Sequence, residues 1–128
     1  MLTAKPSANN ELTSPGYPNS YPTGLNCEWN ISAPLGYIVK LTFSDFELPF
    51  NSDATCLGGD FVELRDGPSL SDDLIKRACF ALGDQEPGYQ PFYSSGQHMH
   101  VVFKSHQTHS SAKGFNASYT AVKLGKVI

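Results

Sequence analysis

The histidines of this 128-residue chain are clustered, since all four fall between His98 and His109. His98 and His100 are two residues apart in the segment HMHVVF, so on a β-strand their side chains would share one face and could chelate Zn²⁺ or Cu²⁺. His106 and His109 follow in a polar segment and could complete a metal site or a pH-sensitive patch. The alternative, which we prefer, is that His98 and His100 are exposed polar residues on a solvated strand face.

Residues suited to covalent catalysis are present, but not in a known catalytic arrangement. Ser94 and Ser95 stand close to His98, yet the chain has no G-x-S-x-G, H-E-x-x-H or C-x-x-C motif. Cys27 lies two residues before the only tryptophan, Trp29, so on a strand both side chains would point inward. A reactive thiol needs exposure and a positive neighbourhood, so a buried structural cysteine is the better interpretation. We therefore expect that the protein is not an enzyme.

Two sequons could accept N-linked glycans, NIS at Asn30 and NAS at Asn116. Each asparagine has the outward parity of its strand, because its neighbour, Ile31 or Phe115, has the inward parity. Glycan attachment is therefore sterically plausible at both positions. The alternative is a chance match of the motif at a polar position.

Alternation of apolar and polar residues indicates the strands that position these side chains. The segments IVKLTF, FVELRDG, HMHVVF and FNASY each have a period of two, which is typical of half-buried strands. Turn-forming stretches such as PNSYPTG, SAPLG and SSGQ separate them. Only SDDLIKRACF, residues 71–80, hints at a helical turn. Many short strands joined by tight turns predict an all-β fold, an antiparallel β-sandwich.

Composition limits the function classes. The net charge is −3, and the nine lysines and arginines are scattered without a basic tract, which disfavours nucleic acid as a partner. No apolar run approaches the 18 or so residues of a membrane span, so we expect no membrane insertion. The first ten residues, MLTAKPSANN, have no apolar core and are not a signal peptide.

Five motifs together resemble the CUB domain, an extracellular β-sandwich module of complement proteases, tolloid-type proteinases, neuropilins and cubilin. They are SPGYPNSYPTGLNCEW, FSDFEL, CLGGDFVELRDGPS, VVFKS and GFNASY, in the family's order and over nearly the whole chain. The resemblance implies a jelly-roll-like sandwich of two antiparallel sheets, in agreement with the alternation. It also implies that residues 1–128 are a single CUB-like domain, excised from a longer secreted or cell-surface protein.

The cysteines depart from the family pattern of two disulfides, because this chain has only three. The resemblance implies that Cys56 and Cys79 form the second disulfide. Cys27 matches the second cysteine of the first pair, whose partner would stand near Met1. We therefore expect Cys27 to be unpaired.

The calcium site of many CUB domains is a second departure. The resemblance assigns its three acidic positions to Pro49, Asp60 and His106, of which only Asp60 is acidic. Calcium prefers several oxygen ligands, whereas proline offers no side-chain ligand and histidine offers nitrogen. We therefore expect a degenerate calcium site and no cofactor.

The function that the resemblance implies is non-catalytic recognition or scaffolding of another extracellular or cell-surface protein. The candidate binding loops lie around the degenerate calcium site and carry Pro49, Phe50, Asp60, His106 and His109. One alternative is a carbohydrate- or glycosaminoglycan-binding module, which the scattered basic residues disfavour. Another is an accessory domain of a secreted protease.

Overall fold

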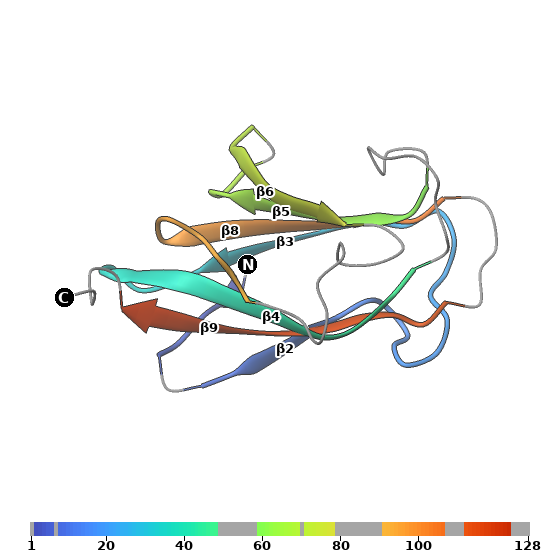
Figure 1. Cartoon of the computed structure of the whole chain (residues 1–128), viewed down its shortest axis with the longest axis horizontal. Coiled ribbons are helices and arrows are strands. Elements are labelled where there is room, and N and C mark those ends of the chain that lie inside the picture. Colours follow the sequence, from blue (N-terminus) through green and yellow to red (C-terminus); the bar gives the residue numbers. More distant parts are fainter. Residues whose placement is uncertain are drawn as a thin grey trace.

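The protein is a sandwich of two β-sheets, seen in a computed structural model that describes residues 2–6, 8–48, 59–69, 71–78, 91–106 and 112–123 (Figure 1). One sheet has the strand order β1-β3-β8-β5-β6 and the other the order β2-β9-β4-β7. All strand pairs are antiparallel except β1 with β3. The strands are β1 (Leu2–Thr3), β2 (Asn10–Thr13), β3 (Asn26–Ser32), β4 (Tyr37–Glu47), β5 (Phe61–Asp66), β6 (Asp73–Ala78), β7 (Phe92–Tyr93), β8 (His98–Lys104) and β9 (Gly114–Lys123). The predicted all-β sandwich is therefore confirmed.

The core lies between the two sheets and is built from the inward parity of each strand. Val39, Leu41 and Phe43 on β4 are all at most 3% exposed. Phe115 of β9 contacts both Phe43 and Phe103 edge to face, with ring centroids 5.8 and 5.3 Å apart. Phe103 belongs to one sheet, and Phe43 and Phe115 belong to the other, so these rings connect the two sheets. The alternating pattern therefore identified the sheet faces that pack against each other. Within the described residues, no helix is long and apolar enough to cross a membrane.

The hint of a helical turn in residues 71–80 is wrong, because Asp73–Ala78 forms the edge strand β6. Pairing with β5 places Arg77 opposite Glu63 on the outer face of the sheet. Ile75 packs against the core from the same strand. These tertiary interactions outweigh a weak local preference for helix.

The turn-rich segment before β3 is anchored to both sheets. Ser14 is fully buried, and its Oγ accepts a hydrogen bond from the Phe115 amide and donates one to the Lys113 carbonyl. Tyr21 is also buried and packs edge to face on Phe103, 5.0 Å between centroids. The segment therefore crosses the end of the sandwich and delivers the chain to β3 in a fixed register.

Candidate binding surfaces

Asp60 lies at the centre of one end of the sandwich, immediately before β5. It is buried, and both of its carboxylate oxygens accept hydrogen bonds. Oδ2 accepts from the Tyr21 hydroxyl at 2.5 Å, and Oδ1 accepts from the His106 amide at 2.8 Å. Nδ1 of His106 is 3.7 Å from Oδ1, close enough for an ion pair when the imidazole is protonated.

Further hydrogen bonds join the segments next to this carboxylate to one another. The hydroxyl of Ser105 donates to the Pro22 carbonyl at 2.9 Å and accepts from the Leu25 amide at 2.8 Å. The Gly24 amide donates to the His106 carbonyl at 2.9 Å. The chain before β3, the start of β5 and the end of β8 are thus connected by hydrogen bonds between protein groups.

The Tyr21 hydroxyl stays protonated and therefore remains a hydrogen-bond donor to Asp60. Burial raises the pKa of Tyr21, and the hydrogen bond to the Asp60 carboxylate and the charges of Asp60 and Glu47 raise it further. The hydroxyl therefore keeps its proton at every pH at which the domain would operate.

Of the three positions that the resemblance assigns to a calcium site, Asp60 and His106 lie among the described residues. Both oxygens of Asp60 are engaged, and Oε1 of the nearby Glu47 accepts a hydrogen bond from the Lys113 amide at 2.8 Å. In the described ranges no group of three or more His, Cys, Asp or Glu residues could hold a metal ion. One carboxylate already hydrogen-bonded twice would leave most of the ion's charge unbalanced.

The structure does not describe five of the site residues that were predicted from the sequence. Pro49, Phe50, Cys56, Cys79 and His109 lie outside the described residues.

Cys27 is a free, half-buried cysteine on β3 that packs against the core. Burial raises the pKa of its thiol, which disfavours the reactive thiolate.

The two sequon asparagines, Asn30 and Asn116, are both half-buried, and the Nδ2 of Asn30 donates to the Pro68 carbonyl at 3.3 Å.

His98 and His100 share the outer face of β8, but each interacts with a residue of β3. Nδ1 of His98 is 3.0 Å from the Ser32 hydroxyl, and Nε2 of His100 is 3.0 Å from Oε1 of Glu28. Our interpretation of His100 as a solvated residue is wrong, because it is only 8% exposed. It lies between Asn30 and Arg65 in the sheet, on a strand that has a neighbour on each side.

A buried carboxylate on the same outer face escaped the sequence analysis. Glu63 of β5 is 6% exposed and accepts hydrogen bonds from Nε of Arg65 at 2.8 Å and Nε of Arg77 at 2.9 Å. Burial would raise the pKa of Glu63, but the two guanidinium groups outweigh it and hold the pKa below its ordinary value. Alternation assigned Glu63 to the outer face, but only the pairing of β5 with β6 places Arg77 beside it.

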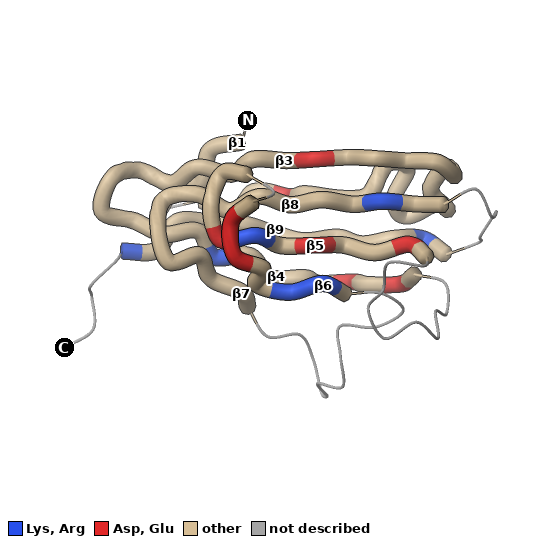
Figure 2. The backbone as a smooth tube through the Cα atoms, turned by 90° about the horizontal axis from the view of Figure 1, so that it is seen from above, with Lys and Arg blue, Asp and Glu red and all other residues tan. Residues whose placement is uncertain are grey.

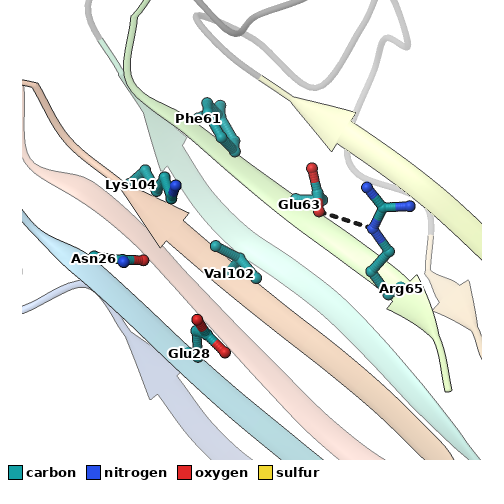
Figure 3. Close-up of a pocket in the computed structure, with 7 residues that line it drawn as sticks. All are labelled: Asn26, Glu28, Phe61, Glu63, Arg65, Val102 and Lys104. Atoms are coloured by element: carbon teal, nitrogen blue, oxygen red, sulfur yellow. Dashed lines mark hydrogen bonds and ion pairs between the residues drawn. The ribbon is translucent and has the colours of Figure 1, made fainter. Parts of the chain in front are cut away.

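A hollow of about 290 Å³ lies on this face over strands β3, β8 and β5 (Figure 3). Val102 is at its centre, between Glu28 and Glu63 of the neighbouring strands. Its lining residues are Asn26, Glu28, Phe61, Glu63, Arg65, Val102 and Lys104.

Comparison with known proteins places the chain in a family. Residues 3–119 match the family model described as "CUB domain". The chain is 37% identical over 121 residues to mouse complement C1r subcomponent-like protein, covering 91% of this chain and 24% of that protein. It is 39% identical over 115 residues to human tolloid-like protein 2, covering 90% and 10%, respectively.

A solved structure of the CUB1-EGF-CUB2 domain of human MASP-1/3 superposes with a TM-score of 0.76 at 33% identity, covering 91% of this chain and 42% of that one. The chain thus spans a tenth to a quarter of the length of these two curated relatives. The motifs, the two-sheet sandwich and the match over residues 3–119 agree, and the chain belongs to the CUB domain family.

Proposed function

We propose that this CUB domain is a non-catalytic, extracellular module that recognises another secreted or cell-surface protein through the loop end around Asp60, without calcium. The observation that carries this proposal is the engagement of both Asp60 oxygens by Tyr21 and His106. These bonds, with those of Ser105, supply the order that a metal would otherwise give to the loops. A pre-ordered loop end loses little conformational entropy when it binds a partner.

The contacts of the candidate nucleophiles support a non-catalytic role. The Ser94 hydroxyl donates to the Gly96 carbonyl and accepts from the Val39 amide. The Ser95 hydroxyl donates to Asp66 at 2.7 Å. In the described part of the chain, these hydrogen bonds of Ser94 and Ser95 do not involve a histidine that could activate the hydroxyl as a base.

Two further points concern the longer protein. Because the chain spans only part of each relative, we infer that it is one domain of a larger extracellular protein. One relative is named an inactive serine protease, PAMR1, and is 37% identical over 103 residues. An accessory role beside a protease-like domain is therefore the second candidate.

Glycosaminoglycan binding is less well supported by the charges. Arg65 and Arg77 are committed to Glu63, and the Nζ of Lys113 is 2.9 Å from Asp45. Each of these three bases therefore already has a carboxylate partner, although Arg65 and Arg77 share theirs.

A multimerised form of the domain, screened against arrayed secreted and cell-surface ectodomains, tests the proposal. Binding should persist in EDTA and should be lost in His106→Ala, which removes an exposed side chain at the loop end but keeps the backbone bond to Asp60. Leu35→Ala is the matched control, because Leu35 is 86% exposed in the turn after β3, at the opposite end of the sandwich. Loss of binding in EDTA, or equal binding by both variants, would contradict the proposal.

A further inference from the structure

The hollow over Val102 lies on the outer face of the sheet, next to the loop end, and has an apolar floor. Val102 is 3% exposed and Phe61 is 6% exposed, although both lie on the outer face of the sheet. The guanidinium carbon of Arg77 lies over the Phe61 ring, 6.0 Å from its centroid. The floor is therefore a formed apolar surface rather than a gap between mobile side chains.

The charges around the floor are unevenly distributed. Glu63 is shared by two arginines, and Arg65 also donates to the Asp72 carbonyl, so this wall carries an excess of positive charge. On β3, Glu28 is engaged through Oε1 by His100. The lining holds two cations, Arg65 and Lys104, and two carboxylates, Glu28 and Glu63. Arg77 lies outside the lining and adds a third cation through its ion pair with Glu63. Figure 2 shows the opposite charges of β3 and β8 side by side.

Of the two cations that line the hollow, Lys104 is the one available to bind an anionic ligand. In the described part of the chain, its ammonium group has no ion pair, unlike Arg65, Arg77 and Lys113. Asn26 is its direct register partner on β3, so a lysine ammonium and a side-chain amide stand next to each other at one edge of the apolar floor. These two groups can donate hydrogen bonds to a single carboxylate.

We propose that this hollow binds a small organic monoanion, in which one carboxylate is attached to an apolar body the size of an aromatic ring. The carboxylate would lie between Lys104 and Asn26, and the body would cover Val102 against the Phe61 ring. A cavity of about 150 Å³ accommodates benzene, so about 290 Å³ holds a ring and its carboxylate. Glu28, two residues after Asn26 on the same face of β3, repels a second negative charge and so selects a monoanion.

Titration of the ¹⁵N-labelled domain with phenylacetate, followed by NMR, tests this assignment. The backbone amide shifts should saturate with a dissociation constant on the order of a few millimolar, as expected for ten heavy atoms. They should be centred on Asn26, Val102 and Lys104. Acetate, which lacks the ring, and phenethylamine, which carries the opposite charge, should each give less than about a fifth of these shifts at the same ionic strength.

Variants distinguish a site from non-specific adsorption. Lys104→Gln should weaken phenylacetate binding about fivefold, the upper end of the loss expected for an exposed ion pair. Lys123→Gln, at an exposed position at the end of β9, should leave it unchanged. Val102→Phe should fill the hollow and abolish saturation, and the dispersion of the spectrum shows whether that variant is folded. Absence of saturable shifts up to about 50 mM, equal shifts with phenethylamine, or an unchanged affinity in Lys104→Gln would overturn the proposal.

Discussion

The hydroxyl of Tyr21 donates a hydrogen bond to Oδ2 of Asp60, with 2.5 Å between two oxygens that are 39 residues apart in the chain. Both residues are buried, and Asp60 also accepts the His106 amide. The bond therefore joins the turn-rich segment before β3 to the start of β5, next to the end of β8. Because this end of the sandwich carries the proposed binding loops, their order depends on a phenol–carboxylate pair.

Tyr21→Phe should destabilise the domain by about 1–3 kcal/mol, because it leaves a buried carboxylate oxygen without a donor. The measurement is equilibrium urea denaturation at pH 7. Tyr17→Phe is the matched control, since the Tyr17 hydroxyl also bonds to a carboxylate, Asp45, but Tyr17 is only half-buried, whereas Tyr21 is buried. The control should lose less stability, and an equal loss in both variants would show that burial of the Tyr21–Asp60 pair contributes nothing.

Gly114→Ala should be more destabilising than Gly36→Ala by about 2 kcal/mol or more. Both glycines have positive φ, 92° and 89°, so the backbone strain of an alanine is similar at the two positions. A Cβ at position 114 would lie 1.9 Å from Oγ of Ser14, whereas one at position 36 would meet nothing within 4 Å. The difference between the two unfolding free energies therefore isolates the close approach of Ser14. Similar values for both would mean that Ser14 moves aside without loss.

The sequence predicted the faces of the strands better than the contacts across them. Parity alone placed Val39 and Phe103 in the core, because a half-buried strand must alternate. Parity also put His100 and Glu63 on the outer face, but it could not show that both are buried there. Their burial depends on which residues of β3, β5 and β6 lie beside them, and that register is set by tertiary structure.

The loop end was only partly predictable for a related reason. The CUB resemblance pointed to Asp60 and His106 as members of one site, and the structure brings them within hydrogen-bonding distance. The resemblance gave no signal for the role of Tyr21, because this residue lies in a proline-rich segment without periodicity. A side chain from such a segment can be placed only when the path of the backbone is known.

The acid sensitivity of the domain should depend on Glu63. Its pKa is lowered on folding, so in acid the unfolded state binds more protons and stability rises with pH. The contribution of Glu63 is complete above the ordinary glutamate pKa of about 4.3 and is lost as the pH falls through its lower value in the folded state. Glu63→Gln should lose about 1–2 kcal/mol at pH 7 and should flatten the stability profile between about pH 5 and pH 2.

Thermal melts across this pH range provide the measurement. Glu11→Gln removes an exposed carboxylate from β2 and serves as the control, because it changes the net charge by the same amount as Glu63→Gln. It should alter the profile less than Glu63→Gln. A Glu63→Gln variant with an unchanged slope in acid would contradict the role of the arginine-paired carboxylate.

The thiols should differ in accessibility. We expect oxidised protein to contain one thiol per chain, from Cys27, with Cys56 and Cys79 joined in a disulfide. Cys27 should react with a bulky disulfide reagent at least about tenfold more slowly in the folded protein than in guanidinium, because it is half-buried and its pKa is raised. Three thiols per chain would contradict the disulfide, and rapid labelling without denaturant would contradict the inward position of Cys27.

Calcium should bind more weakly than millimolar, and its removal should leave the melting temperature unchanged. Asp60 is the only carboxylate at the three positions that the family resemblance assigns, and its oxygens already accept hydrogen bonds from Tyr21 and His106. A calcium ion there would have to displace the buried tyrosine hydroxyl, with little carboxylate charge to compensate its dehydration. Isothermal titration with Ca²⁺, beside melts in calcium and in EDTA, gives the measurement.

The double substitution Pro49→Glu with His106→Asp tests the same argument from the opposite direction. It places carboxylates at the two positions where the resemblance expects them and removes the imidazole 3.7 Å from Asp60. Binding should then become measurable, with a dissociation constant on the order of 0.1–1 mM, as in other extracellular calcium modules. Its melting temperature should rise with calcium through ligand linkage. A wild-type domain that binds calcium tighter than millimolar, and loses it in Asp60→Asn, would show instead that Asp60 exchanges its protein donors for the ion and that recognition is calcium-dependent.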